Sequence, residues 1–376
     1  MSDDVKTEKG AAGKGLSRRQ LLVRSAAGAG AVGVAGVGAY AYHKTKGTPR
    51  DELPVPVRED YRPVDQRNTI FTFAASRKLQ EEHPGRSEKF GGFDFYREAE
   101  RLRNRDRQVP MKDEPGYTQL DRALDMAGLY ADQALAPGEQ NMIPNTGVGS
   151  WDQSGVAERR FDFPSGEEAA LAIKTAAKLF HATRCGITRR DRRWDYDPLY
   201  DPGEERPISW DEFPFEPKTV IVLLSEMEYH GVSASPYWTS LGANMEGYAM
   251  ATKVAGQIAE FLRQLGYHAV AAGNDLGISV AYATAAGLGE PARNGTLIAP
   301  KIGPRHRISK VYTDLELVEY DRPRTFGIQS FCANCKRCAD ACPSEAITFD
   351  DDPSWEPTYA GADDPDVAWT ANPGVF

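Results

Sequence analysis

Four of the five cysteines stand in one short run near the carboxyl end of the chain, and their spacing suits iron–sulfur chemistry. The run reads C-x2-C-x2-C-x3-C-P and contains Cys332, Cys335, Cys338 and Cys342, followed by Pro343. In bacterial-type proteins with two [4Fe-4S] clusters, the first three thiolates of such a run bind one cluster and the fourth binds the other. The sequence therefore predicts a protein that transfers electrons.

A zinc site and a disulfide framework are the alternatives for this run. Zinc sites usually have two pairs of ligands separated by a longer loop, and disulfide scaffolds are short chains dense in cysteine. This chain has five Cys in 376 residues, so we favour iron–sulfur clusters. The fifth cysteine, Cys185, stands alone in a predicted strand, where a cysteine usually serves as a small buried apolar residue.

The cysteine run is incomplete for a pair of clusters. Two bacterial-type clusters need a second run, and no thiol follows Cys342 up to Phe376. As the sequence stands, one cluster has three evident ligands and the other has one. We therefore expect the chain to be the front part of a longer protein, truncated or frameshifted near residues 372–376.

Residues 1–41 have the pattern of a twin-arginine export signal. A Ser-Arg-Arg-Gln-Leu-Leu segment at 17–22 precedes an uncharged Ala, Gly and Val run at 25–42, with a small-residue cleavage site at 39–41. A transmembrane anchor is the alternative, but five glycines make the run weakly hydrophobic for a stable span. We expect export to the periplasm or to the outer face of the cytoplasmic membrane.

The charge of the chain argues against nucleic acid as a partner. The formal net charge is −9, and residues 1–41 carry six basic and three acidic groups, a net +3, which leaves −12 for residues 42–376. An acidic chain of this kind is a poor candidate for binding a phosphate backbone. With 41% hydrophobic residues it can bury a substantial core.

The chain divides into three parts after residue 41. Residues 42–164 are rich in Pro, Arg, Asp and Gly and predict a wrapping region with short helices at 93–102 and 120–134. From 165 to 325 the pattern is regular, and 326–376 carries the cysteine run. In the regular part we expect helices at 165–180, 241–265 and 278–288 and strands at 182–187, 220–224 and 268–272. This alternation predicts an α+β fold with an α/β-like layered core.

One part of the regular region resembles a known family. Residues 287–307, GLGEPARNGTLIAPKIGPRHR, followed by VYTDL at 311–315, resemble the corrinoid-dependent reductive dehalogenases. FLRQLGYHA at 261–269 and the Phe-Cys pair that opens the cysteine run occur in the same order in that family. The Asn-Pro-Gly at 372–374 resembles the segment that precedes the family's second cysteine run, which fits a truncated chain.

This resemblance implies cofactors, partners and an activity. It implies a nitroreductase-like core that binds a cobamide, an incomplete ferredoxin-like segment at 326–376, and two [4Fe-4S] clusters in the intact pattern. The corrinoid is expected to be base-off, and none of the six His lies in a D-x-H-x-x-G loop. The implied reaction is reductive cleavage of a carbon–halogen bond in a small organohalide, with a membrane anchor protein and a quinone-linked donor as partners.

The resemblance also implies a catalytic group made of Tyr248, Asn274 and Arg307. In this group Tyr248 is the general acid toward the carbon that loses halide. A fixed guanidinium beside a phenol favours the phenolate, which makes release of the proton easier. Three routes stay open: cobalt attacks the halogen, cobalt attacks the carbon, or the electrons pass by outer-sphere transfer.

Each of these residues also has an ordinary interpretation. Tyr248 lies on the apolar stripe of its helix, Asn274 follows a glycine at a strand end, and Arg307 could pair with an acidic neighbour. Arg305 would share a strand face with Arg307 and is its main rival. The aromatic-rich loop at 228–238 includes two candidates for a substrate pocket, Tyr237 and Trp238.

Two other functions stay open at this point. One is an enzyme similar to epoxyqueuosine reductase, which pairs a cobamide with ferredoxin-like clusters but is cytoplasmic. The other is a non-catalytic electron-transfer protein or truncated remnant. No sequence feature indicates the oligomeric state.

Overall fold

The computed structural model describes residues 46–57, 59, 61–69, 72–73, 76–84, 110–135, 151–201, 204–342 and 347–353. The chain forms two units, Met1–Gly47 and Thr48–Phe376, and the account below concerns the second. The expected export signal, the expected helix at 93–102 and the Asn-Pro-Gly at 372–374 lie outside the described residues. Within the described part, no helix combines the length and apolar character needed to cross a membrane.

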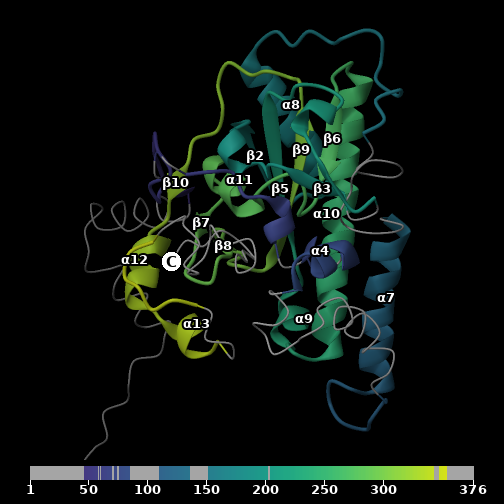
Figure 1. The fold of residues 1–376 in the computed structure, drawn as a ribbon, viewed down its shortest axis with the longest axis vertical. Helices are drawn as coiled ribbons and strands as arrows, with labels where there is room; N and C mark the ends of the chain where they lie inside the picture. Colours follow the sequence, from purple (N-terminus) through teal and green to yellow (C-terminus); the bar gives the residue numbers. More distant parts are fainter. Residues whose placement is uncertain are drawn as a thin grey trace, which may run out of the picture. The chain divides into compact units, whose positions relative to one another are not determined.

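A four-stranded antiparallel sheet forms the centre of this unit (Figure 1). Every pair of neighbouring strands is antiparallel, so the mixed helix and sheet fold is of the α+β kind. In sheet order the strands are β2 (Arg184–Arg189), β5 (Thr219–Glu226), β9 (His306–Thr313) and β6 (Ala269–Ala272).

Helices cover both faces of the sheet. On one face, Ile221 and Val311 share a core cluster with apolar residues of α8 (Gly166–Leu179) and α10 (Trp238–Gln264). On the other face, Val222 and Tyr312 pack with α11 (Ser279–Ala285). Successive residues of a strand point to opposite faces, so β5 carries apolar residues on both sides, as a sheet covered on both faces requires. Strand β9 places Val311 on one face and Tyr312 on the other.

The three helices predicted for the regular region, 165–325, are present, with shifted ends. The Oγ of Ser165 accepts from the amide of Glu168 and caps α8, as the Ser-x-x-Glu pattern predicts. Helix α10 begins three residues earlier than predicted and ends before Gly266, which has a left-handed backbone with φ +78°. Helix α11 is shorter than predicted because Gly287, at φ +68°, turns the chain away.

Strand β2 starts and ends two residues later than the predicted strand at 182–187. Its Cys185 is half-buried and packs against the core cluster of α8 and α10. Burial raises the pKa of the Cys185 thiol to about 12, so the thiol stays protonated at neutral pH. This agrees with the interpretation of Cys185 as an apolar packing residue.

Strand β9 extends beyond its neighbour β6. All eight residues of β9 pair with β5, but only Lys310 to Thr313 pair with β6, because β6 ends at Ala272 opposite Lys310. In the described part of the chain, residues 306–309 therefore have no strand partner on the β6 side. The chain leaves the sheet at this point, and the space beside the free half of β9 becomes a cavity.

Smaller elements surround this core. Helix α7, predicted at 120–134, runs along α10 over Gln119–Leu135. The remaining elements are β1 (Thr48–Pro49), η1 (Gln66–Asn68), α4 (Arg77–Glu82), η2 (Arg192–Trp194), β3 (Leu199–Asp201), β4 (Arg206–Ile208), η3 (Trp210–Glu212), α9 (Tyr229–Ser233), β7 (Glu290–Pro291), β8 (Leu297–Ile298), β10 (Arg324–Thr325), α12 (Ile328–Asn334) and α13 (Arg337–Asp340).

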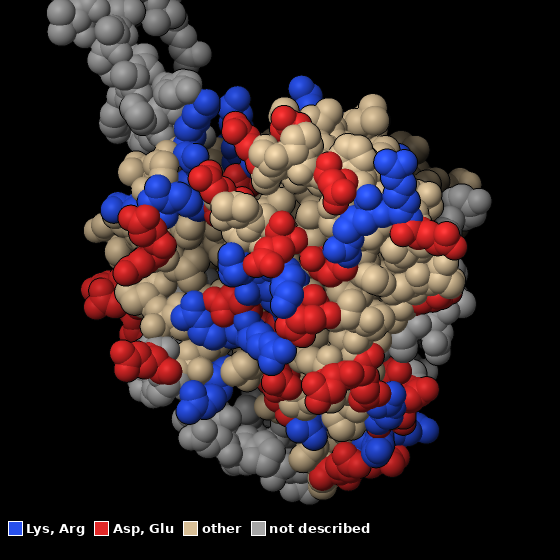
Figure 2. Space-filling model, turned by 90° about the horizontal axis from the view of Figure 1, so that it is seen from above, with Lys and Arg blue, Asp and Glu red and all other residues tan. Residues whose placement is uncertain are grey.

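Basic and acidic side chains are interleaved on the face that Figure 2 shows. The ion pairs of the described residues reflect the same mixing. Arg206, for example, bonds to both Glu204 and Glu212, and all three side chains are exposed. Exposed pairs of this kind contribute little to stability, typically about 0 to 1 kcal/mol each.

Candidate active site

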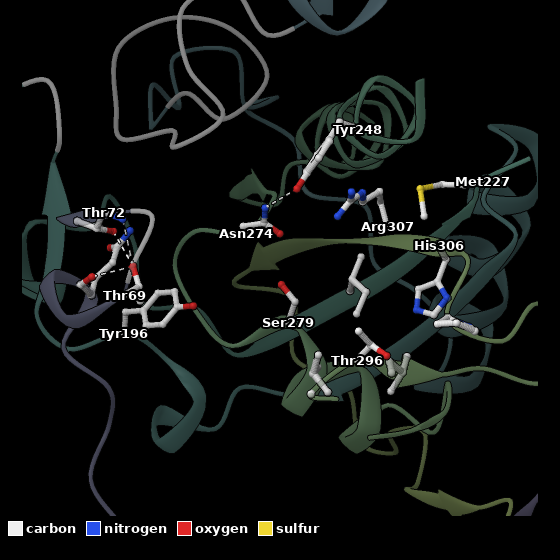
Figure 3. A pocket seen from close by; sticks show the side chains of 16 residues that line it. Thr69, Thr72, Tyr196, Met227, Tyr248, Asn274, Ser279, Thr296, His306 and Arg307 are labelled. Carbon is white, nitrogen blue, oxygen red and sulfur yellow. Dashed lines mark hydrogen bonds between the residues drawn. The ribbon is translucent and has the colours of Figure 1, made fainter. Parts of the chain in front are cut away.

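The three residues predicted to be catalytic come from three different elements and meet at one cavity (Figure 3). Tyr248 lies in α10, Asn274 follows β6, and Arg307 is the second residue of β9. The amide Nδ2 of Asn274 donates to the Tyr248 hydroxyl at 3.3 Å. The guanidinium carbon of Arg307 lies 4.0 Å from the centre of the Tyr248 ring, a cation–π distance.

A glycine in α10 allows Arg307 to reach Tyr248. A Cβ atom at Gly247 would lie 2.7 Å from Met227 Cγ and 3.2 Å from Arg307 Cγ, closer than side chains normally approach. Because Gly247 has no side chain, Arg307 can extend along the helix surface to the next residue, Tyr248. The local sequence of α10 thus determines where the cation sits.

The cavity has a volume of about 360 Å³, within the range of small-molecule sites. Its walls come from the first half of β9, the loop after β6, α10, β8 and the segment around η1. Its lining residues are Gln66, Thr69, Thr72, Tyr196, Met227, Tyr248, Asn274, Ser279, Val280, Gly295, Thr296, Leu297, Pro304, His306, Arg307 and Ile308. The cavity therefore contains all three predicted catalytic side chains.

Tyr237 and Trp238 lie outside this cavity. Trp238 is the first residue of α10 and is 3% exposed, with its ring edge-on to Tyr117. Tyr237 also packs edge-on to Tyr117. The expected loop that carries them is partly helical, because the carboxylate of Glu228 caps α9. Both aromatic residues pack at the start of α10 and away from Tyr248.

Arg305 does not share a strand face with Arg307, which corrects the expectation from the sequence. It precedes β9, and its guanidinium binds Glu226 Oε1 at 2.8 Å and the carbonyl oxygen of Met227 at 2.6 Å. These bonds direct Arg305 away from the cavity. Of the two arginines, only Arg307 lines it.

Burial governs the charges at the cavity. It lowers the pKa of the Arg307 guanidinium, and the Tyr248 phenol acts in the opposite direction. Arginine remains a cation at neutral pH even so. Burial also lowers the pKa of His306 to about 4, so this imidazole is neutral at pH 7.

Two buried polar atoms at the cavity have no hydrogen-bond partner in the described part of the chain. They are Nδ1 of His306 and Nε of Arg307. Buried polar atoms are nearly always paired, so such atoms in a cavity are suited to bind the polar groups of a ligand. The cavity thus offers a cation, a phenol, an amide and a neutral imidazole.

Sequence reasoning missed several residues of the cavity wall. Thr69 and Thr72 come from the region interpreted as wrapping, and their hydroxyls bond to each other at 2.8 Å. Nothing in their local pattern indicates a site, because only the tertiary fold brings them to the cavity. His306 lies in the segment 287–307, next to Arg307, and this position was the one signal in the sequence that it belongs to the site.

The four cysteines of the run lie on α12 and α13 and at the ends of these helices. Cys332 is buried in α12, whereas Cys335, Cys338 and Cys342 are half-buried. In the described residues, no group of three or more His, Cys, Asp or Glu side chains is arranged to hold a metal ion. The iron–sulfur clusters therefore stay a prediction from the spacing.

A buried arginine connects the cysteine segment to the core. Arg293, 3% exposed, donates to the carbonyl oxygen of Cys332 at 2.8 Å and to those of Thr348 and Asp350 at 2.7 Å each. Nearby, the Glu290 carboxylate accepts from two backbone amides that lead into α12. The segment is thus held through its backbone.

Comparison with known proteins identifies relatives of this chain. No protein-family model matches it. The tetrachloroethene reductive dehalogenase of Desulfitobacterium hafniense is 38% identical over 302 residues, which cover 64% of this chain and 54% of the relative. The chain is homologous to the reductive dehalogenases. It spans about half the length of the curated relatives it matches.

A solved structure supports the same relationship. The catabolic reductive dehalogenase NpRdhA superposes with a TM-score of 0.56 at 26% identity, over 82% of this chain and 39% of that chain. The epoxyqueuosine reductase of Lactococcus garvieae is 36% identical over only 73 residues, or 19% of each chain. The relationship to reductive dehalogenases is therefore the more extensive one.

Proposed function

We propose that this chain carries the catalytic core of a reductive dehalogenase. The observation that carries the proposal is the convergence of Tyr248, Asn274 and Arg307 on one cavity in a chain homologous to that family. The reaction replaces halogen by hydrogen in a small organohalide, takes up two electrons and one proton, and releases halide. The protein itself must supply the proton and a site that excludes water.

In this proposal Tyr248 is the proton donor. Its hydroxyl faces the cavity and accepts a hydrogen bond from Asn274, so its own proton stays available for a group in the cavity. Arg307 lies against the ring and stabilises the phenolate that remains after the proton leaves. Asn274 fixes the direction of the hydroxyl.

We further propose a base-off cobamide and [4Fe-4S] clusters as cofactors. The cobamide supplies the electrons for cleavage of the carbon–halogen bond when it is bound. His306 Nδ1 and Arg307 Nε fit the amide groups of a corrin, because both are buried and without a hydrogen-bond partner in the described residues. Cluster binding is supported by the spacing of Cys332 to Cys342 and by homology alone, since the described residues form no metal site.

The setting of the protein is also part of the proposal. A nitroreductase-like core with a ferredoxin-like cluster segment fits the described fold and the homology. The twin-arginine pattern at residues 17–22 supports export, with a membrane anchor protein and a quinone-linked donor as electron source. Tetrachloroethene, which names the relatives, is the first substrate to test.

The test uses full-length protein, reconstituted without oxygen with iron, sulfide and cobamide. Halide release from tetrachloroethene is measured for wild type, Tyr248→Phe and the control Tyr267→Phe. Tyr267 donates to the carbonyl oxygen of Phe161, beyond the other end of α10. Loss of a general acid lowers rates by about 100- to 10,000-fold, so we expect this loss for Tyr248→Phe only, with cobamide retained. Equal turnover in the two variants would exclude Tyr248 as the acid.

A further inference from the structure

Lys310 lies in the middle of β9 and is completely buried. Lysine is almost never fully buried unless its ammonium group is paired, because loss of water disfavours the charge. Burial lowers the pKa of Lys310 to about 8, and the carboxylates of Asp275 and Asp195 act in the opposite direction. The side chain therefore keeps its charge at neutral pH, deep inside the protein.

The ammonium group of Lys310 joins the two ends of one loop. Its Nζ donates to the carbonyl oxygen of Gly273 and to the Oγ of Ser279, each at 2.6 Å. Residues 273–278 form the whole connection between β6 and α11, and Ser279 is the first residue of α11. Bonds from a charged donor are the stronger class of hydrogen bond in proteins.

The two halves of this loop are held by different groups. The second half is fixed by backbone bonds, from Tyr196 to Leu276 at 3.0 Å and from Ile278 to Trp194 at 2.7 Å. The first half contains Asn274, and Lys310 binds the carbonyl oxygen of the residue just before it. The amide of that same residue, Gly273, donates to Asp275 Oδ1 at 2.7 Å. The Oγ of Ser279 also donates to the carbonyl oxygen of Gly273, at 3.4 Å. Asn274 therefore depends on Lys310, Asp275 and Ser279 for its position.

We propose that Lys310 is a positioning residue of the active site, which fixes the start of the loop so that the Asn274 amide stays bonded to the Tyr248 hydroxyl. Lys310 does not line the cavity, whereas Asn274, Ser279 and Tyr248 do. It therefore acts through Asn274 and touches no ligand in the cavity. The bonds from Lys310 to Gly273 and Ser279 form a tether between the two ends of the loop. An effect of Lys310 on turnover rests on the proposed function, whereas the tether itself does not.

Hydrogen exchange tests the tether without any measurement of activity. Lys310→Met is compared with wild type and with Lys174→Met in the full-length, reconstituted protein. Lys174 binds Asp321 at 2.6 Å and belongs to α8, on the other face of the sheet. We expect the amides of residues 274–279 to exchange at least about tenfold faster in Lys310→Met, with α10 unchanged, and no such change in Lys174→Met. Unchanged exchange in the loop would overturn the proposal.

A double-mutant cycle separates positioning from general destabilisation. If Lys310 acts through Asn274, its loss adds nothing once the amide is gone. Halide release by Lys310→Met/Asn274→Ala should then match that of Asn274→Ala within about twofold. If halide release in the double variant falls by the product of the two single losses, Lys310 acts by a route other than Asn274. If wild type released no halide, the proposed function would fail, and the exchange result would still decide on the tether.

A second variant keeps the proposal testable if Lys310→Met does not fold. Ser279→Ala removes one of the two acceptors of Lys310, together with the longer bond from Ser279 Oγ to Gly273, and leaves the buried charge in place. We expect faster exchange at residues 274–279 in this variant, by a smaller factor than in Lys310→Met. Exchange at the wild-type rate in Ser279→Ala, with Lys310→Met unfolded, would reject the tether in favour of a purely structural role.

Discussion

Tyr248, Asn274 and Arg307 reach one cavity from three elements that are distant in the sequence, whereas the four cysteines occupy a single short stretch on α12 and α13. The group predicted to be catalytic depends on the sheet and on α10 for its geometry. The cysteine segment is attached to the core mainly through backbone bonds to Arg293 and Glu290.

This difference shows which functional residues a sequence motif defines and which are brought together only by the tertiary fold. Ligands that are close in sequence can be recognised from their spacing before any tertiary structure is known. A constellation of distant residues is defined only when strands pair in one register and a helix packs on them. Variants in the two regions should therefore fail in different ways.

The largest effect is expected for Cys338→Ser in the full-length protein. Loss of one thiolate should remove bound iron and the EPR signal of a reduced cluster, and should abolish halide release, because a cluster needs its ligands. The unfolding temperature of the core should stay close to that of wild type. The matched control is Cys185→Ala, which should retain iron, since this thiol packs in β2. Full iron content in Cys338→Ser would contradict a cluster at this run.

Arg307→Lys should reduce kcat by about 100- to 1,000-fold, the usual loss when one electrostatic group of an active site is removed. An ammonium is a compact charge and cannot lie flat against the Tyr248 ring as a guanidinium does. The neighbouring Arg305→Lys is the control, because Arg305 binds Glu226 away from the cavity. Similar losses in both variants would show that the position of the cation is unimportant.

Acid should weaken the core through His306. Its pKa is about 4 in the folded protein and near 6.5 when unfolded, so the unfolded state binds more protons between these values and stability falls as the pH decreases. From pH 6.5 to 5 we expect a loss of about 2 kcal/mol in the free energy of unfolding. The free energy of unfolding of wild type and His306→Gln is measured with denaturant at pH values between about 5 and 6.5. The variant should lack the part of the pH dependence that His306 contributes. The cysteine segment has no histidine and should not contribute.

Asn274→Ala should have the smallest effect. It removes one hydrogen bond to the Tyr248 hydroxyl, and such a bond contributes about 1 kcal/mol, which corresponds to a two- to tenfold change in kcat. KM should change little, because the amide orients the acid. A change in KM alone would instead indicate that Asn274 binds the substrate.

Much of the fold was predictable from local pattern. The ends of α8 and α10 follow from Ser165 and Gly266, which are a capping residue and a helix stop. The order and direction of the strands were not predictable, since β5 is apolar on both faces and its pattern therefore gives no register. Polar residues such as Lys310 interrupt the apolar pattern of β9, and their partners are seen only in three dimensions.

The candidate site was predictable in part. The resemblance supplied Tyr248, Asn274 and Arg307, and the structure brings them together. It did not supply the threonines of the wrapping region, and the two aromatic candidates lie elsewhere because α10 begins at Trp238. The spacing within one motif identifies its ligands, but it does not indicate which distant loops line the same cavity.

The early end of β6 has a consequence for how this site can change during evolution. Along residues 306–309, β9 has no described strand partner on the β6 side, and alternate residues of a strand direct their main-chain groups to such an edge. Apart from substitution by proline, which removes an amide, mutation of side chains cannot delete these groups. On the proposed function, preference among substrates would therefore change through side chains such as Thr296, whereas the main-chain edge of β9 beside the cavity would stay the same.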